Sequence, residues 1–271
     1  MAGEQFGRVV ALEFGQPGTL GQRIDGLRIR FRVRRSRTGS PDAAEVAVWN
    51  ASPEALASLG DPGVVVRVLA GYGTASQVVG GSLVRKSLRV EDDGVDRVAV
   101  FQIADGGLAL RSVRVSQGWA SAVKASELVE YLRAAAAWSR GTIRLGTDVE
   151  YTTGEVLIGS VGPELDRIVR DCGSQWSVQN GALQVWPLGE SRPRETGPLL
   201  SPTSGLLGSP RTVDGGIEVR CLLLPGMLPG MPYRVASRDV EGDFIATDVE
   251  HDGDSGFGNE FQTTIVGVPR G

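Results

Sequence analysis

The chain has 271 residues, of which 41% are hydrophobic and 38 are glycine, enough for one large domain or two to three small ones. Its formal net charge of −4 lacks the basic excess that a nucleic-acid-binding surface normally leaves. Its two cysteines, Cys172 and Cys221, stand in apolar stretches and predict buried, reduced thiols. No apolar signal region or membrane-length apolar run is found, so we expect a soluble protein that starts in a reducing cytoplasm.

The first part of the chain, residues 7–115, predicts short strands separated by glycine, proline and acidic turns. One helix interrupts them at 52–59, with Ser52 as N-cap and Pro53 in the first turn. Such a succession of strands and turns favours an antiparallel barrel or a sandwich. The predicted strands span roughly 7–14, 27–35, 45–49, 63–71, 77–90, 96–104 and 111–115.

The strand at 27–35 carries a basic cluster that alternates with apolar residues. Arginines fall on one face of an extended strand and apolar side chains on the other, because successive side chains point to opposite faces. The two faces are Arg28, Arg30, Arg32 and Arg34 (the arginine ladder) and Leu27, Ile29, Phe31 and Val33.

Three interpretations of the arginine ladder remain open. It can be a solvated outer face, a nucleic-acid groove, or a subunit interface that meets acidic residues of a neighbour. A nucleic-acid groove would need interleaved aromatic residues, which this strand lacks. Arginine is enriched at protein contacts, so we favour the subunit interface over solvent as the working hypothesis.

The middle of the chain, about 116–190, predicts an α+β segment. It opens with a helix capped by Ser126, and a second helix at 163–172 begins at a first-turn proline and ends at Gly173. The apolar stripes of the two helices are Leu128, Val129, Leu132, Ala135 and Ala136 in the first, and Leu165, Ile168, Val169 and Cys172 in the second.

A tight hairpin follows, with strands 175–178 and 182–186 joined across Asn180-Gly181. This dipeptide tolerates the positive φ angles that a two-residue hairpin turn requires. We expect Trp176, Val178, Leu183 and Val185 to lie within cross-strand reach.

Residues 191–204 are rich in Pro, Ser, Arg and Gly and are typical of a linker, whereas 205–271 predict strands again. Residues 63–69 and 216–222 both read G-[VI]-x-V-R-x-L. Acidic turns follow at 91–94 and 250–254, and each is followed by an apolar strand. This echo is either a coincidence among β-strands or the trace of a duplicated barrel, in which 63–104 and 216–268 would be equivalent strands.

Some residues suggest chemistry. Gly253-Asp254-Ser255-Gly256 matches the string around the nucleophile of chymotrypsin-like proteases, but His251, the only histidine, lies four residues from Ser255 and in the wrong chain order. The acidic residues nearby lack the ligand spacing of a calcium loop. We therefore interpret 250–256 as a polar hairpin loop and expect no catalytic, cofactor or metal site. The tryptophans sit in helix or strand patterns, which argues against a carbohydrate-binding module.

The ordered set of motifs resembles the baseplate hub proteins of contractile-tailed bacteriophages, of the late-control-D type. No single motif is diagnostic, and Trp49 departs from the pattern, which has an apolar β-branched residue there. The matching segments are the helix 163–172, Gly173–Val178, the Asn180-Gly181 turn, Gly205–Pro210, Val219–Pro225 and, in the N-terminal half, 31–35, 47–52, 66–72 and 80–83.

The resemblance implies a mainly β fold with a small α+β insertion and two tube-like antiparallel β-barrel domains. We expect a first barrel at 1–115, an α+β middle domain at 116–190, a linker at 191–204 and strands completing the second barrel at 205–271.

It also implies a non-enzymatic, homotrimeric hub in the virion baseplate, assembled in the host cytoplasm. The hub would join the six-fold tail tube to the three-fold central spike around a channel. The expected partners are the tube and spike proteins and other baseplate and tape-measure proteins, with DNA only in transient passage, no membrane and no cofactor. The alternatives are another tail adaptor, such as a distal tail or tube-initiator protein, and a tail-associated cell-wall hydrolase.

Overall fold

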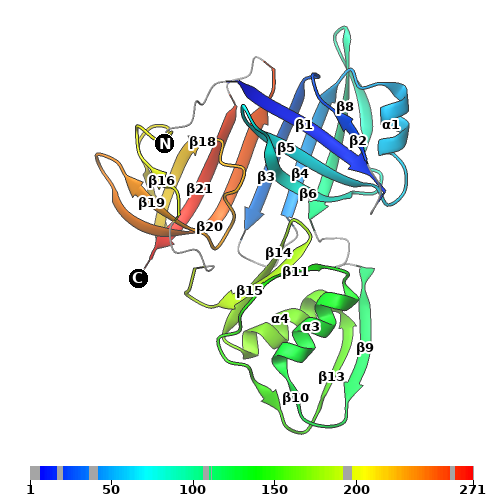
Figure 1. Ribbon diagram of the computed structural model, residues 1–271, viewed down its shortest axis with the longest axis vertical. Coiled ribbons are helices and arrows are strands. Elements are labelled where there is room, and N and C mark those ends of the chain that lie inside the picture. The colour runs from blue at the N-terminus through cyan, green and yellow to red at the C-terminus, as the bar shows by residue number, and fades with distance from the viewer. Residues whose placement is uncertain are drawn as a thin grey trace. The chain divides into compact units, whose positions relative to one another are not determined.

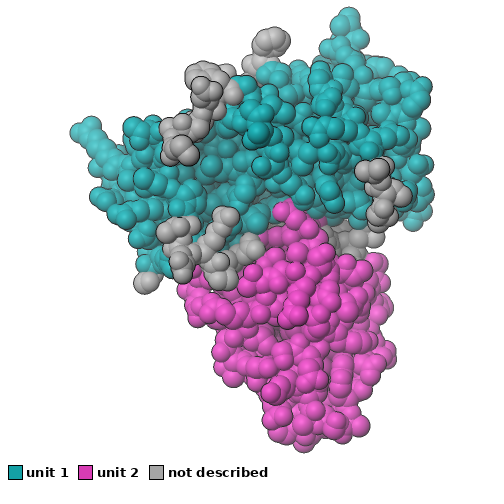
Figure 2. Space-filling view, in the orientation of Figure 1, with its two compact units in different colours: residues 1–35, 43–104, 193–271 teal, residues 36–42, 105–192 magenta. Residues whose placement is uncertain are grey.

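The computed structural model describes residues 7–16, 21–36, 42–105, 110, 112–191, 197–256 and 260–270. The chain divides into two compact units (Figure 2). Unit 1 comprises Met1–Arg35, Ala43–Ala104 and Pro193–Gly271, and unit 2 comprises Ser36–Asp42 and Asp105–Arg192. The N-terminal and C-terminal parts of the sequence therefore fold together, and the middle part folds by itself.

The strands of unit 1 form one sheet of 14 strands (Figure 1). Its main path runs β17-β18-β21-β20-β3-β4-β8-β6-β5-β1-β2, while β7 pairs with β8, β19 with β20, and β16 with β19. The strands are β1 (Arg8–Gly15), β2 (Gln22–Ile24), β3 (Ile29–Ser36), β4 (Asp42–Trp49), β5 (Val65–Tyr72), β6 (Ser76–Leu83), β7 (Arg89–Asp93), β8 (Asp96–Asp105), β16 (Leu199–Leu200), β17 (Arg211–Val213), β18 (Gly216–Leu222), β19 (Pro232–Ala236), β20 (Glu241–Asp254) and β21 (Phe261–Pro269).

Two hydrophobic cores lie within unit 1. The first is built mainly from the inward side chains of β1, β3, β4, β5, β6 and β8, and the second from β18 to β21 with Leu200 and Met227. Nearly all the strand pairs are antiparallel, and β16–β19 is a parallel exception. The mainly β fold class with large antiparallel sheets is thus confirmed. The two separate cores fit a chain that carries two β-barrel halves.

The one helix of unit 1 that the structure describes, α1 (Pro53–Leu59), follows its sequence signals. The Ser52 side chain accepts a hydrogen bond from the Ala55 N–H, and Pro53 occupies the first turn, where its missing N–H costs nothing. Of its residues only Leu59 is fully buried, so the cap and the proline fix this helix more than its packing does.

Unit 2 is an α+β fold around its own core. Helices α3 (Ala125–Ala135) and α4 (Val161–Asp171) pack together, and their apolar faces meet the buried residues of strands β14 and β15. The strands are β9 (Arg114–Trp119), β10 (Val123–Lys124), β11 (Ser139–Ile143), β12 (Glu150–Tyr151), β13 (Glu155–Ser160), β14 (Ser174–Gln179) and β15 (Ala182–Pro187).

The predicted hairpin is confirmed in unit 2. Asn180 and Gly181 join β14 to β15 with φ angles of 54° and 73°. The register pairs Trp176 with Val185 and Val178 with Leu183, as expected from the turn. The turn is also held from outside, because the carboxylate of the buried Asp105 accepts hydrogen bonds from the backbone N–H groups of Asn180 and Gly181.

Other boundaries differ from the sequence prediction. The strand expected at 77–90 is two strands, β6 and β7, because the chain turns at 84–88, where Lys86 adopts a φ of 62°. Strand β2 was not anticipated. The N-cap of α3 is Lys124 rather than Ser126, and Asp148 satisfies the free helix end by accepting hydrogen bonds from the Ser126 N–H and hydroxyl.

The expected linker, 191–204, contains structure where it is described. Residues 192–196 lie outside the described residues, while Leu199 and Leu200 form β16 and pair in parallel with β19. The domain boundaries expected from the sequence stay a prediction.

The strand order does not follow the internal echo in the sequence. In the first copy, 63–69 falls in β5, which pairs with β6, whereas in the second copy 216–222 falls in β18, which pairs with β21. The acidic segment 250–254 is not a turn either, since it forms the end of β20. The expectation that 63–104 and 216–268 are equivalent strands in the same order is therefore wrong, because local pattern does not specify which strands become neighbours.

Candidate subunit interface

The arginine ladder lies on the outer face of the sheet, along β3. The predicted alternation is confirmed, since Ile29, Phe31 and Val33 are buried and the arginines between them are exposed. The last basic residue of the cluster, Arg35, faces inward, where its guanidinium donates a hydrogen bond to the Val78 carbonyl. The ladder is thus four arginines on one face, with a fifth arginine that serves the core.

Acidic residues of the same chain lie opposite the ladder. Strand β20 is the neighbour of β3 in the sheet, and it places Glu250, Asp252 and Asp254 on the same outer face. The ion pairs are Arg28–Asp254 at 2.8 Å, Arg30–Glu260 at 2.9 Å, Arg32–Asp252 at 2.6 Å, and Arg32 and Arg34 with Glu250 at 3.2 Å each. The carboxylates that the sequence analysis sought on a neighbouring subunit are thus present within the chain, and the interface role of the ladder stays a prediction.

The pairs differ in how strongly they are held. Arg28 and Asp254 form two hydrogen bonds, and only 4% of the Asp254 side chain is exposed, against 67% for Arg34. Burial by itself raises the pKa of the Asp254 carboxyl, but hydrogen bonds from Arg28 and the Gly256 N–H outweigh it and hold that pKa below its usual range. The Arg28–Asp254 pair therefore stabilises the contact between the start of β3 and the end of β20, whereas Arg34 stays accessible to solvent or to a partner.

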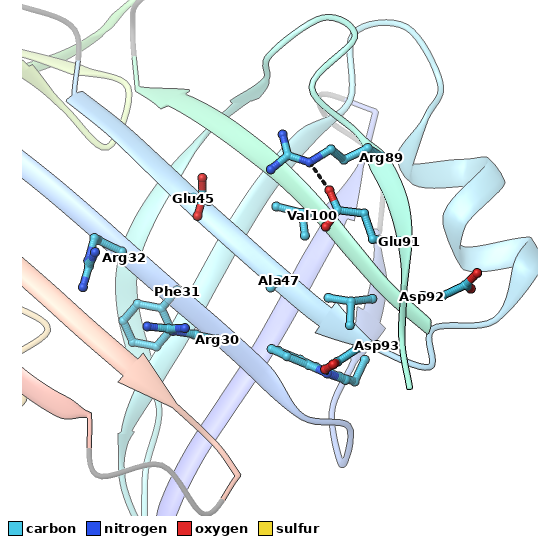
Figure 3. A pocket seen from close by; sticks show the side chains of 12 residues that line it. Arg30, Phe31, Arg32, Glu45, Ala47, Arg89, Glu91, Asp92, Asp93 and Val100 are labelled. Carbon is cyan, nitrogen blue, oxygen red and sulfur yellow. Dashed lines mark hydrogen bonds and ion pairs between the residues drawn. The ribbon is translucent and has the colours of Figure 1, made fainter. Parts of the chain in front are cut away.

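A groove borders the ladder on the outer face of the sheet and is lined by residues of β3, β4, β7 and β8 (Figure 3). Arg28 stacks on the Trp49 ring at 4.2 Å, and the Trp49 indole N–H donates to Asp93 of β7 at 3.0 Å. The hollow, which we call the charged groove, has a volume of about 450 Å³ and runs from Arg30 and Arg32 to Glu91 and Asp93. Ala47, Val98 and Val100 contribute apolar surface to it.

The protease-like string Gly253-Asp254-Ser255-Gly256 has a structural explanation. A Cβ on Gly253 would stand 2.3 Å from Cζ of Phe31, so only glycine leaves room for that buried ring. The Ser255 hydroxyl accepts from the Ile29 N–H at 2.9 Å and donates to the Leu27 carbonyl at 3.2 Å. Together with Asp254, these contacts bind the end of β20 to the start of β3.

His251 lies in a buried position of β20, which corrects the expectation of a solvated loop. Its Nδ1 lies 2.9 Å from Oγ1 of Thr263, and its Nε2 lies 3.2 Å from the Met227 carbonyl. Both ring nitrogens are therefore engaged, and Ser255 has partners of its own at the start of β3. The pair shows no nucleophile and base arrangement.

The hydrogen bonds of His251 determine its tautomer. A carbonyl only accepts, so Nε2 must carry a hydrogen and donate it to Met227. The Thr263 oxygen accepts from the Leu224 N–H at 2.9 Å, which leaves its hydroxyl hydrogen for Nδ1. The ring is neutral in this network, and burial together with the nearby Arg35 lowers its pKa from 6.5 to about 3.

Among the described residues, no group of three or more His, Cys, Asp or Glu side chains is placed to hold a metal ion. Cys172 and Cys221 are free and buried, and burial raises the pKa of the Cys221 thiol to about 12. No helix in the described ranges is long and apolar enough to cross a membrane.

The acidic stripe on β20 was not predicted from the sequence. Its signal was present, because Glu250, Asp252 and Asp254 alternate with a period of two, as a strand requires. The run of charged residues and glycines suggested a turn instead. The stripe is a strand because residues 250–253 pair with 261–264 of β21, and the ladder, more than 200 residues away in sequence, compensates its carboxylates.

The comparisons with solved structures identify the fold. The prophage MuSo2 43 kDa tail protein from Shewanella oneidensis aligns over 97% of this chain and 99% of its own, with 10% identity and a TM-score of 0.69. A tail protein from Neisseria meningitidis MC58 gives 12% identity, coverages of 95% and 96%, and a TM-score of 0.66. This protein has the fold of these phage-type tail proteins.

A third likeness extends beyond phages. The E. coli c3393 protein is described as a component of the type VI secretion system with structural similarity to the T4 bacteriophage tail proteins gp27 and gp5. The identity is 10%, the TM-score is 0.60, and the alignment covers 95% of this chain and 77% of that one. No protein-family model and no curated protein matches the chain.

Proposed function

We propose that this protein is a structural component of a phage tail, and specifically a baseplate hub that joins the six-fold tail tube to the three-fold central spike. The observation that supports this most is the fold shared with two tail proteins over nearly the full length of both chains. The motif order that resembles baseplate hubs points the same way. The protein would act by assembly, as part of the virion.

The arrangement of unit 1 suits such a symmetry adaptor. One chain carries two hydrophobic cores, each built mainly from its own strands, so three chains would present six β-rich halves to a six-fold tube. The main path of the sheet ends at β2 and β17, whose outer edges pair with no other strand among the described residues. Closed rings cover such edges by pairing them between subunits, and a ring leaves a central channel through which DNA could pass.

The mass of the assembled protein tests this proposal. Light scattering on purified protein should give three chains per particle, and electron microscopy should show a ring with a central opening. A six-chain ring would favour a distal tail or tube-initiator adaptor instead. A particle that stays monomeric at high concentration would contradict every ring model.

The arginine ladder needs a separate test of its interface role. Changing several arginines to glutamate would place carboxylates against Glu250, Asp252 and Glu260 and so damage the fold itself. A charge swap, Arg30→Glu with Glu260→Arg, keeps the pair within the chain but reverses the charges that a neighbour meets. Loss of the ring with an unchanged melting temperature would support the interface, and an intact ring would place this part of the ladder in solvent.

The enzymatic alternative, a tail-associated cell-wall hydrolase, is tested by degradation assays on purified peptidoglycan. We expect no activity above that of the buffer, because His251 and Ser255 serve separate structural hydrogen bonds. Activity that Ser255→Ala abolishes, in a protein that still folds, would restore this alternative.

A further inference from the structure

Strand β7 is an exposed edge of the sheet. It pairs with β8 through five register pairs, from Arg89–Val100 to Asp93–Asp96, and no other strand pairs with it in the described part of the chain. All five of its residues are exposed. An edge of this kind presents a row of backbone N–H and C=O groups that another chain can pair with.

The two faces of β7 border different hollows. Arg89, Glu91 and Asp93 line the charged groove, and Figure 3 shows Glu91 beside Arg89 on that face. Val90 borders a second hollow of about 360 Å³, to which Pro53 and Leu56 of the α1 segment also contribute. We call it the apolar hollow. Each face of the edge thus offers space to the side chains of an added strand, and each offers a different chemistry.

The charge at this edge is not balanced within the chain. Glu91 pairs with Arg89 at 2.6 Å, while Arg30 and Arg32 already pair with Glu260 and Asp252. Two carboxylates of β7 beyond these pairs line the groove. Asp92 makes no ion pair among the described residues, and Asp93 accepts the neutral Trp49 indole N–H and is attracted by Arg28, which already pairs with Asp254. A basic ligand would complement them.

We propose that β7 is a docking edge for an extended segment of a partner protein that carries lysine or arginine at alternate positions and apolar residues between them. The segment pairs with the free edge of β7 and extends the sheet. Its basic side chains enter the charged groove toward Glu91 and Asp93, and its apolar side chains enter the apolar hollow beside Val90. The inference concerns one surface of unit 1 and does not depend on the tail role.

A labelled peptide of alternating lysine and valine is a direct probe. Its binding to the full chain is followed by fluorescence anisotropy at low and high salt. We expect binding that weakens as salt rises, because paired charges at the surface are screened. A matched peptide with N-methyl groups on the backbone nitrogens that would face β7 keeps the charges but cannot donate to the edge, and it should bind at least about tenfold more weakly.

Variants of the protein test the two faces separately. The double change Glu91→Gln and Asp93→Asn should weaken binding about tenfold. The amide oxygens can still accept from Arg89 and from the Trp49 indole, so the melting temperature should change little. Val90→Lys should also weaken it, since a charge on this face opposes an apolar side chain. Asp214→Asn, an exposed acid in the β17–β18 turn, is the control and should bind as the parent does.

Several outcomes would overturn the proposal. Equal binding of the N-methylated peptide would exclude strand addition, and binding unchanged by the Glu91 and Asp93 changes would exclude the charged groove. No binding of the parent protein at low salt would reject the site. If light scattering shows that Val90→Lys changes the number of chains per particle, the occupant is a second copy of this chain and the assignment to a basic partner is wrong.

Discussion

The buried His251 predicts a specific dependence of stability on pH. Its pKa in the folded protein is about 3, well below the ordinary value of 6.5 that it regains on unfolding. Between these values the unfolded chain binds a proton that the folded chain does not. The free energy of unfolding therefore rises with pH across this window, reaches its full value above pH 6.5, and falls as the pH drops toward 3.

The size of the effect follows from the window. Each pH unit below 6.5 lowers the free energy of unfolding by up to about 1.4 kcal/mol. At pH 5, His251 alone should therefore lower it by about 2 kcal/mol relative to pH 8. The cause is structural. The ring is fully buried, where a charge is poorly solvated, and protonation would place that charge near Arg35.

The assay compares the parent protein with His251→Gln by chemical denaturation at pH 5, 6, 7 and 8. Glutamine can still bond to Thr263 and Met227 but does not titrate, so the stability advantage of the parent should shrink by about 2 kcal/mol from pH 8 to pH 5. His251 is the only histidine, so its ring signals in NMR are assigned without ambiguity and should not move between pH 7 and 5. Parallel stability curves for the two proteins, or a ring titration near pH 6.5, would refute the reasoning.

Three further predictions concern stability, each with a matched control measured by the same denaturation. Gly181→Val should lower the free energy of unfolding by about 1 kcal/mol or more, because a β-branched residue resists a φ of 73° even though no atom blocks its Cβ. Asn180→Gly is the control and should cost little, and an equal loss in both variants would reject the turn argument. Gly253→Ala should destabilise unit 1 by about 1–3 kcal/mol, because the added Cβ would overlap the Phe31 ring. Gly226→Ala is the control and should not destabilise the protein, because the space around its Cβ is open. Similar melting temperatures for the two variants would contradict this packing. Arg28→Ala should lower the free energy of unfolding by about 1–3 kcal/mol, because it leaves the buried Asp254 without its cation. Arg34→Ala should lower it by less than about 1 kcal/mol, because that pair is exposed. The reverse ranking would show that burial does not set the strength of these pairs.

The sequence by itself determined the features that depend on neighbouring residues. The Asn180-Gly181 turn, the Ser52 cap with Pro53, and the in-and-out alternation of β3 all follow from the conformational preferences of a few adjacent residues. The order of these motifs along the chain was also enough to suggest a tail protein, and the fold comparisons agree with that class of fold.

The tertiary structure decided everything that depends on which strands become neighbours. The acidic end of β20 became a strand because it pairs with β21 and the arginines of β3 compensate its charge, and His251 lies buried with hydrogen bonds to Thr263 and Met227. Leu199 and Leu200, in a stretch with the composition of a linker, became a strand because β19 pairs with them. The partners lie outside the local pattern, from 12 residues away for Thr263 to 226 between Arg28 and Asp254, and the folded sheet brings them together.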